Sequence, residues 1–408
     1  MIIWLVNPFD PLPGDPEQEG RYATLARLLA AKGHKVTWWT STFSHRFKRP
    51  VDQQAITTAC GAIGIEVRFL CAPAYHRNVG IRRLWNHWLL SEHFRKTARN
   101  ESALPDVLVA SMPPPMLLRQ AVRFAKRCGA KTIVDIQDLW PETFHRLGPK
   151  PLRPFLQLVL LPWQKAACNT YKAADALVGV ADAYIDRAVD LAGPKKVTSC
   201  IPLGIDLTLF DNAAAKGVCS EFTKPDDEVW FVYAGSLNLS YDCLTLTRAF
   251  AKISKALNKP ARLFITSRGE LHTEVEKIIQ QERLGNITLT GFLDFPRWAY
   301  LLSQCDVGFN ASFPQAMIYL PNKIFYYFAA GVAVLNTIPG QCSRIIRAGN
   351  CGLDYEAGDV NSCAIAIERI VSNPELLITM QRNARNLAEA RYDRKLLYSQ
   401  YVELIEYL

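Results

Sequence analysis

The chain has 408 residues, more than one ordinary hydrophobic core holds, so its length predicts two domains of about 200 residues each. With 49% hydrophobic and 21% charged residues it has the composition of a globular protein, and it contains no run of about 18 apolar residues that would span a bilayer. Residues 1–200 carry a net charge of +11 and residues 201–408 one of −2, so we expect the N-terminal half to face an anionic partner.

Eleven cysteines are spread along the chain without a Cys-x-x-Cys pair or a Cys/His cluster with metal-ligand spacing. Their number is odd, and this usage is typical of reduced, mostly buried thiols in a cytosolic protein. The apolar run at the N-terminus is too short for a signal peptide. We therefore expect a cytoplasmic protein.

The first elements form a βαβ unit. Residues 2–6 predict a buried parallel strand, a Pro/Gly-rich loop follows as far as Gly20, and a helix over 22–32 leads into a second strand over 34–40. The unit lacks the Gly-x-Gly-x-x-Gly fingerprint of dinucleotide-binding folds, which argues against a dehydrogenase. Gly20 is either a glycine that only opens the helix or part of a ligand-binding turn.

Residues 76–99 predict a basic amphipathic helix. Its apolar stripe consists of Ile81, Leu84, Trp85, Trp88 and Leu89. The cations around the stripe are Arg77, Arg82, Arg83, Arg95, Lys96 and Arg99. Such a helix either docks on anionic lipid or covers the sheet of the first domain with its arginines in water. We favour docking, because the charge of the N-terminal half points the same way; no nucleic-acid-binding motif accompanies the basic residues. The residues expected to face the membrane are Arg82, Arg83, Trp85 and Trp88.

Polar side chains follow the strand predicted over 131–136. Gln137 and Asp138 come directly after it, and the C-terminal end of a parallel strand is where α/β proteins place their chemistry. Asp138 is therefore either a residue that orients or deprotonates a substrate hydroxyl or a buried N-cap aspartate. The other elements predicted in this half are strands over 106–111 and 175–180 and a helix over 152–171.

The second half repeats the alternation of strands and helices. Strands are predicted over 228–237, 261–266, 287–293, 306–310 and 332–337, and a final helix over 374–408. The first of these strands ends in a turn at Gly235-Ser236, and Arg268 follows the second strand. Phe292 lies at the end of the third strand.

The segment over 312–331 holds a turn, a lone cation and the start of a helix. Leu320-Pro321-Asn322 breaks the chain, and the residues that follow predict a buried helix that ends at Gly331. Lys323 falls in the first turn, where a cation opposes the helix dipole and is tolerated more easily if an anion lies beside it. The alternative is a surface lysine whose stem lies along an apolar helix.

These segments resemble those of retaining glycosyltransferases of family four. The string LPNKIFYYFAAGVAVLNTIPG is similar to the family's donor-site segment, and DIQDLWPET is similar to its D-x-H/Q-D-L-W-P segment. Gly20-Arg21 matches a family loop that often reads E-G-x-R, and IPLGID matches the segment between the domains. The resemblance implies an α/β protein of two doubly wound Rossmann-like domains that face a cleft, the GT-B fold.

The resemblance also implies a domain organisation and a reaction. The domains would be an acceptor-binding domain over 1–198, a linker over 199–226, a nucleotide-sugar-binding domain over 227–385 and a C-terminal helix over 386–408 that crosses back to the first domain. The enzyme would transfer a sugar with retention and without a metal or other cofactor, because no Asp-x-Asp occurs in the usual place. The donor would be a nucleotide-diphosphate sugar, UDP-linked by preference. The acceptor would be a polyprenyl-linked glycan in bacterial surface-polysaccharide synthesis, at the inner face of the plasma membrane.

The site residues follow from the matching positions. The catalytic candidates are Asp138, Lys323 and Gln137. The donor-binding candidates are Gly20, Arg21, Gly235, Ser236, Arg268, Phe292, Asn322, Lys323 and Tyr326.

The sequence departs from the family at four positions. Ile318 and Tyr326 stand where the family carries a Glu-x7-Glu pair that holds the sugar and the ribose. Ser236 and Tyr241 stand where it carries an Arg and a Lys that neutralise the diphosphate. Three other functions therefore stay open: a non-catalytic GT-B partner protein, a nucleotide-sugar epimerase, or a soluble transferase that acts on a small molecule.

Overall fold

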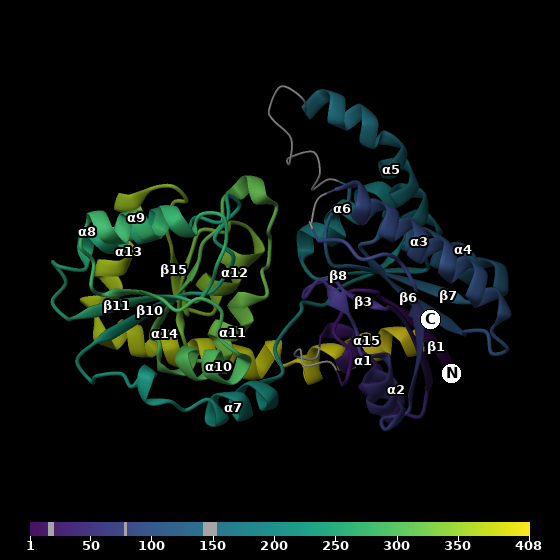
Figure 1. Cartoon of the computed structure of the whole chain (residues 1–408), viewed down its shortest axis with the longest axis horizontal. Coiled ribbons are helices and arrows are strands. Elements are labelled where there is room, and N and C mark those ends of the chain that lie inside the picture. The colour runs from purple at the N-terminus through teal and green to yellow at the C-terminus, as the bar shows by residue number, and fades with distance from the viewer. Residues whose placement is uncertain (15–19, 77–79, 142–152) are drawn as a thin grey trace. The chain divides into compact units, whose positions relative to one another are not determined.

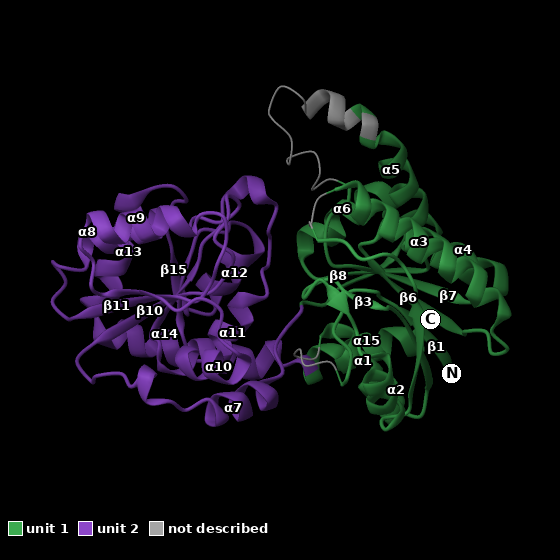
Figure 2. Cartoon of the chain, in the orientation of Figure 1, with its two compact units in different colours: residues 1–202, 395–408 green, residues 203–394 purple. Residues whose placement is uncertain are grey.

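The computed structural model describes residues 1–14, 20–76, 80–141 and 153–408. The chain forms two compact units, each built around one parallel sheet. Unit 1 comprises Met1–Pro202 and Lys395–Leu408, and unit 2 comprises Leu203–Arg394. Figure 2 shows how the last residues of the chain join the first unit.

Unit 1 contains a seven-stranded sheet in the order β5-β2-β1-β6-β7-β8-β9, with every pair parallel. Its strands are β1 Ile2–Val6, β2 Lys35–Ser41, β5 Ile65–Leu70, β6 Val107–Met112, β7 Lys131–Ile136, β8 Ala176–Gly179 and β9 Val197–Cys200. A short antiparallel pair, β3 Phe43–Ser44 and β4 Arg49–Pro50, follows β2. The helices are α1 Arg21–Ala31, α2 Gln53–Gly61, α3 Ile81–Thr97, α4 Pro115–Cys128, α5 Arg153–Ala173, α6 Asp182–Ala192 and α15 Arg394–Tyr407.

Aromatic side chains fill both faces of this sheet because neighbouring residues of a strand point to opposite sides. On one face Trp4 of β1 stacks on Phe124 of α4 at 5.2 Å, and Trp39 of β2 meets Phe94 of α3 at 5.0 Å. On the other face Trp38 lies 6.0 Å from Tyr22 of α1. The sheet is thus covered on both sides, as its apolar strands require.

Unit 2 contains a six-stranded parallel sheet in the order β12-β11-β10-β13-β14-β15. Its strands are β10 Val229–Tyr233, β11 Ala261–Ile265, β12 Ile287–Leu289, β13 Val307–Asn310, β14 Ala333–Asn336 and β15 Gly352–Asp354. Its helices are α7 Leu207–Lys216, α8 Cys243–Ile253, α9 His272–Gln281, α10 Phe295–Gln304, α11 Lys323–Ala329, α12 Gln341–Ala348, α13 Val360–Val371 and α14 Pro374–Leu387 (Figure 1).

Both sheets are doubly wound. The strand order reverses between β1 and β6 in unit 1 and between β10 and β13 in unit 2. Ligands of open α/β sheets lie outside the carboxyl ends of the strands at such a reversal. The predicted fold class, two Rossmann-like α/β domains with parallel sheets, is therefore confirmed.

The structure differs from the sequence analysis around the segment between the two units. The predicted linker over 199–226 contains the end of β9 and the whole of α7, which packs on α10. A Cβ at Gly217, just after α7, would lie 1.9 Å from the Pro296 carbonyl oxygen, so only glycine allows this close packing.

The predicted final helix over 374–408 is wrong as one continuous element. The chain runs through α14 and a π-helical turn, Ala388–Tyr392, and leaves the helical path at Asp393 before α15 begins. There the Tyr392 carbonyl accepts the Ile205 N–H, and the Arg394 N–H donates to the Ile205 carbonyl. This β-type pairing takes the backbone groups that a continuous helix would use.

Candidate active site

The amine of Lys323 lies beneath the turn that follows β10 in unit 2. A Cβ added to Gly235 would lie 3.4 Å from Lys323 Nζ and 3.2 Å from the Tyr233 hydroxyl. The φ angle of Gly235 is +154°, a conformation that L side chains rarely adopt. This glycine therefore lets the backbone at the end of β10 come close to the amine.

Lys323 Nζ is buried and has no hydrogen-bond partner among the described residues. The amine lies over two aromatic rings, 4.7 Å from the centre of Tyr233 and 5.0 Å from that of Tyr241. Burial lowers the pKa of Lys323 from 10.5 to about 7, against the opposing influence of Cys342 and Cys243. A buried ammonium without an anion is costly, so the site favours a negatively charged ligand.

Tyr327 holds this corner of unit 2 together. Its hydroxyl accepts the Ala234 N–H at 3.0 Å and donates to the Phe309 carbonyl at 3.2 Å. A Cβ at Gly308 would lie 2.9 Å from the Tyr327 ring. Helix α11 is thereby fixed against the ends of β10 and β13, at the reversal of strand order.

Three more predicted donor residues lie on turns at the same edge of the sheet. Ser236 is exposed directly after Gly235. Arg268 follows β11, and its Nε would lie 3.2 Å from a Cβ at Gly291. Phe292, after β12, is 71% exposed. Strands β10, β11 and β12 are neighbours, so their ends bring these residues to one edge.

Asn322 and Tyr326, two of the predicted donor-binding residues, differ in the atoms that they could offer to a ligand. The Asn322 Oδ1 atom is buried, and the described part of the chain offers it no hydrogen-bond partner. Tyr326 is 9% exposed and its ring packs edge-on against Trp298 at 5.0 Å. The position where the family carries a carboxylate is thus filled by an aromatic ring in a core, while Ile318 is half-buried on the preceding loop.

In unit 1 the side chain of Arg21 is buried and hydrogen-bonded within the protein. Its guanidinium is 2% exposed and forms a double hydrogen bond with Asp135, at 3.0 and 2.9 Å. It also donates to the Ile201 carbonyl at 2.8 Å and lies 5.1 Å from the ring of Tyr398. Arg21 thus forms a buried ion pair that ties α1 to β7 and α15, and its contact with the donor stays a prediction.

Gly20 serves the start of α1. The Asp10 carboxylate accepts the Tyr22 N–H at 2.5 Å, and a Cβ at Gly20 would lie within 2.5 to 2.7 Å of that carboxylate. Glycine here gives Asp10 room to satisfy the first turn of the helix.

Gln137 and Asp138 lie where the sequence predicts, after β7. The Gln137 amide donates to Asp135 at 2.9 Å. The Asp138 carboxylate accepts the Leu139 N–H at 2.8 Å and the Trp140 indole N–H at 3.0 Å. These two hydrogen bonds hold the carboxylate oxygens in place, and the partial exposure of Asp138 keeps them within reach of a ligand.

Helix α3 turns its predicted apolar stripe outward. Ile81, Trp85 and Trp88 are 85%, 54% and 48% exposed. The buried residues of the helix are Asn86, His87, Leu90, Ser91 and Phe94. Leu84 and Leu89 of the stripe are half-buried, and the helix covers the sheet of unit 1 through its buried residues, with Phe94 against Trp39. Docking of the exposed part of the stripe on lipid stays a prediction. Arg82 is exposed beside Trp85, whereas Arg83 turns toward Trp140, with its Cζ 4.7 Å from the ring centre. Arg77 lies outside the described residues.

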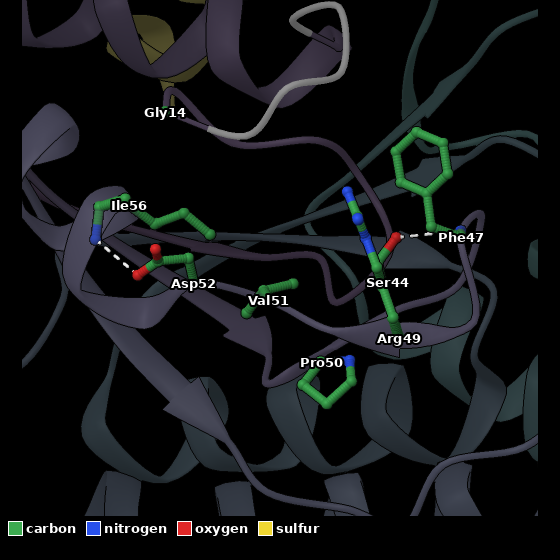
Figure 3. Close-up of a pocket in the computed structure, with 9 residues that line it drawn as sticks. Gly14, Ser44, Phe47, Arg49, Pro50, Val51, Asp52 and Ile56 are labelled. Carbon is green, nitrogen blue, oxygen red and sulfur yellow. Dashed lines mark hydrogen bonds between the residues drawn. The ribbon is translucent and has the colours of Figure 1, made fainter.

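A cavity of about 350 Å³ lies in unit 1, away from the residues that the sequence singles out (Figure 3). It is lined by Gly14, Ser44, Phe47, Arg49, Pro50, Val51, Asp52, Ala55 and Ile56. A smaller hollow next to it shares Ser44 and Val51 and reaches Phe9 and Asp10. Both open beside the loops that follow β1 and β2.

The described residues contain no group of three or more His, Cys, Asp or Glu side chains that could hold a metal ion. Within the same ranges, no helix has a stretch long and apolar enough to cross a bilayer.

Two family models match the sequence. Residues 19–209 match the model described as Glycosyltransferase Family 4, and residues 228–373 match the one described as Glycosyl transferases group 1. None of the curated proteins matches the chain.

Solved structures share the fold over both units. The HepE protein of Anabaena, in complex with UDP, is 15% identical over 100% of both chains, with a TM-score of 0.69. Sucrose-phosphate synthase of Thermosynechococcus elongatus is 18% identical over 99% of this chain and 98% of its own, with a TM-score of 0.70. WaaG, a glycosyltransferase involved in lipopolysaccharide biosynthesis, is 14% identical over 99% of both chains, with a TM-score of 0.66. At these identities the likeness shows the fold.

Proposed function

The chain is a glycosyltransferase of the GT-B fold, and we propose that it transfers a sugar, with retention and without a metal ion, from a nucleotide-diphosphate sugar to a lipid-linked glycan. The setting we propose is the synthesis of a cell-envelope polysaccharide at the inner face of the plasma membrane.

The observation that carries this proposal is the buried amine of Lys323. It has no hydrogen-bond partner in the described structure, and it lies under a glycine turn at the reversal of strand order in unit 2. A departing nucleoside diphosphate gains negative charge in the transition state, and an ammonium fixed in a water-poor site stabilises that charge. Asn322, with its buried carbonyl oxygen, and Gly235 would contact the same donor.

In unit 1, Asp138 is the residue we assign to the acceptor hydroxyl. The carboxylate is oriented by two N–H donors and is partly exposed, which suits a group that takes the proton of an acceptor hydroxyl. Gln137 is tied to Asp135, which fixes the strand end that presents Asp138. The role of Gln137 would be to position Asp138.

The donor and the location are inferred from further features. HepE, which shares the fold, binds UDP, and this favours UDP as the nucleotide here. WaaG acts in lipopolysaccharide biosynthesis, which favours an envelope acceptor. The exposed side chains of Trp85 and Trp88, with Arg82 beside them, support peripheral contact with an anionic membrane.

A thermal-shift screen with UDP-, GDP- and TDP-sugars would identify the donor, and a transfer assay with that donor would test the reaction. The anomeric configuration of the product, read by NMR, distinguishes retention from inversion, and an excess of EDTA tests the absence of a metal. We expect Lys323→Ala to abolish most transfer, while Lys255→Ala, an exposed lysine of the same unit, leaves the rate unchanged. Equal rates for both variants would remove Lys323 from the site.

A non-catalytic partner protein is the second candidate, because Tyr326 fills a family carboxylate position with a buried ring. Titration with UDP and GDP separates the two proposals. An enzyme binds its nucleotide at micromolar to millimolar concentration, whereas a degenerate partner would show no binding at millimolar nucleotide.

A further inference from the structure

Basic and aromatic side chains meet in unit 1 at the carboxyl edge of the sheet. His45 and Lys48 lie in the turn between β3 and β4, and Tyr75 lies after β5. The Tyr75 hydroxyl is 2.5 Å from His45 Nδ1, and Lys48 Nζ is 3.3 Å from the same nitrogen. The Lys48 amine also lies 4.7 Å from the centre of the Tyr75 ring.

Helix α3 completes this group from the other side. Arg83 Nε lies 3.4 Å from His87 Nε2, and the His87 and Trp140 ring centres are 5.5 Å apart. Phe9, from the loop after β1, lies between the two histidines, at 5.2 Å from His45 and 5.4 Å from His87. We call His45, Lys48, Tyr75, Arg83, His87 and Trp140 the cationic cluster.

The cluster is connected to the proposed catalytic residue. The Trp140 indole lies under the Arg83 guanidinium and donates its N–H to the Asp138 carboxylate. Burial lowers the pKa of Arg83, and Tyr75 and then the charge of Asp138 act against this shift. An anion held by the cluster would therefore lie next to the group that we assign to the acceptor hydroxyl.

The electrostatics of the cluster favour an anion. Burial first, and then the charges of Arg83 and Lys48, lower the pKa of His45 to about 4. Burial, Arg83 and His45 lower the pKa of His87 to about 3. Burial and Arg83 also lower the pKa of Lys48. Each cation thus opposes the protonation of its neighbours, and a bound dianion would relieve this repulsion.

The backbone at Lys48 adds an independent observation. Its φ angle is +56°, in the left-handed region that a residue with a Cβ rarely adopts. Such a conformation costs about 1 kcal/mol or more and persists where the surrounding structure holds it. Here it places the amine over Tyr75 and beside His45 rather than in open solvent.

We propose that the cationic cluster binds a phosphate or diphosphate group of the acceptor, so that the acceptor is a sugar phosphoester and not a neutral glycan. The Arg83 guanidinium offers a planar pair of donors for phosphate oxygens, and the Lys48 ammonium offers a point charge. Both cations are half-buried against aromatic rings, which reduces their contact with water and strengthens both contacts. A metal cation is disfavoured by the two fixed positive charges.

This inference rests on the proposed function, since it assigns the substrate class of the same site. The acceptor phosphate proposed for the cationic cluster is distinct from the donor phosphates, which Lys323 of unit 2 would contact. Two sources share this chemistry: the diphosphate of a lipid-linked sugar acceptor and the phosphate of a membrane lipid headgroup. The experiment therefore needs an arm for each.

The first arm compares two acceptors in transfer assays with the full chain. One carries its sugar on a short prenyl diphosphate, and the other carries the same sugar as a neutral prenyl glycoside. We expect Arg83→Gln and Lys48→Ala each to raise the KM for the diphosphate acceptor about tenfold or more, as for the loss of a hydrogen bond to a charged group. The KM for the neutral glycoside should stay unchanged. Arg123→Gln, an exposed arginine on α4, is the charge-matched control.

The second arm measures binding without turnover. With the donor site saturated by UDP, a prenyl diphosphate that lacks a sugar is titrated while tryptophan fluorescence is followed, because Trp140 lies in the cluster. We expect a saturable change in the unaltered protein that Arg83→Gln and Lys48→Ala both weaken. Vesicles of phosphatidylglycerol should produce no change that depends on Lys48.

The outcomes distinguish a failure of the acceptor-phosphate site from a failure of the proposed transfer reaction. Equal losses with both acceptors, no loss with either, or a Lys48-dependent signal from vesicles alone would overturn the acceptor-phosphate site. Cluster-dependent binding of the prenyl diphosphate, in a protein that transfers sugar to neither acceptor, would support the site and refute the transfer reaction.

Discussion

Replacing Lys323 by methionine is expected to stabilise the substrate-free protein at neutral pH while it removes most transfer activity. Burial lowers the pKa of the amine from 10.5 to about 7. At about 1.4 kcal/mol per pKa unit, keeping this buried group costs roughly 4 kcal/mol of unfolding free energy at pH 7. Methionine has a similar length and no charge, so it should recover most of that amount.

The direction of the pH dependence follows from the protons bound in each state. Between about pH 7 and pH 10.5 the unfolded chain carries the Lys323 proton and the folded chain does not, so the destabilising contribution of Lys323 shrinks as the pH rises. The groups that face the amine keep their protons in the folded protein over most of this range but lose them in the unfolded chain, so their own contribution to stability falls as the pH rises. That contribution is common to the parent and to Lys323→Met, and it cancels in the difference between them. Burial raises the pKa of Cys243 to about 11 and of Cys342 to about 12, and it raises the pKa of Tyr233 and of Tyr241.

Urea denaturation at pH 7 and pH 9.5 measures the effect. The excess stability of Lys323→Met should be roughly 4 kcal/mol at pH 7 and about 1 kcal/mol at pH 9.5. Lys255→Met, at an exposed position, should show neither the gain nor the pH dependence. In transfer assays Lys323→Met should lower kcat/KM by roughly 2–4 kcal/mol in transition-state terms. A variant no more stable than the parent at pH 7 would refute the buried ammonium, and an unchanged kcat/KM would refute its contact with the leaving group.

Three other substitutions test the remaining assignments. Asp135→Asn should lower the unfolding free energy by about 3–5 kcal/mol in urea, because it leaves the buried Arg21 guanidinium without its anion; a loss under 1 kcal/mol would contradict a structural ion pair. Asp138→Asn should reduce kcat by about 100-fold or more with unchanged UDP binding in calorimetry, as expected for a lost general base; a wild-type kcat would exclude that role. Trp85→Ser with Trp88→Ser should leave the melting temperature unchanged and reduce cosedimentation with anionic vesicles; full retention on the vesicles would exclude α3 as the contact.

Most strands of the two units could be predicted, because parallel strands buried on both faces are continuous apolar runs. The sequence analysis does not predict β5, β9 and β15, whose residues are in part exposed or half-buried. Residues 2–6 and 131–136 coincide with β1 and β7, and Gly235 lies after β10 as predicted. The position of Asp138 after β7 and that of Lys323 at the start of α11 followed from the same alternation of strand and helix. The local sequence was therefore sufficient to predict the fold class and the loops on which the candidate site lies.

Helix α3 shows what periodicity does not reveal. The pattern predicted an apolar stripe correctly but not the direction in which it points. Asn86 is buried because its amide donates to the Pro73 carbonyl at 2.7 Å, and His87 is buried against Trp140. The hydrogen-bonding and ring contacts that fix this rotation come from residues distant in the sequence. The single basic helix of the sequence analysis consequently separates into an exposed face with Trp85 and a buried face with Arg83.

The sequence likewise does not reveal which residues surround the Lys323 amine or which residues complete the cationic cluster. Tyr233 and Tyr241 enclose the Lys323 amine from the end of β10 and the loop after it, nearly ninety residues earlier in the chain. His45 and Tyr75 reach the cationic cluster from separate strand ends. Tyr233 lies in a predicted strand, Tyr241 and His45 come after predicted strands, and Tyr75 comes after β5, which the sequence analysis does not predict. Only the strand order shows that those ends are neighbours.

The buried lysine also makes a prediction about proton balance on binding. In the free protein at pH 8 the Lys323 amine is largely neutral, because burial holds its pKa at about 7. A diphosphate beside the amine restores its positive charge, so donor binding should take up close to one proton at pH 8. Calorimetric titration of UDP in buffers of different ionisation enthalpy measures this uptake as a change in apparent binding enthalpy. Lys323→Met should bind UDP without it, and an uptake that persists in the variant would assign the proton to another group.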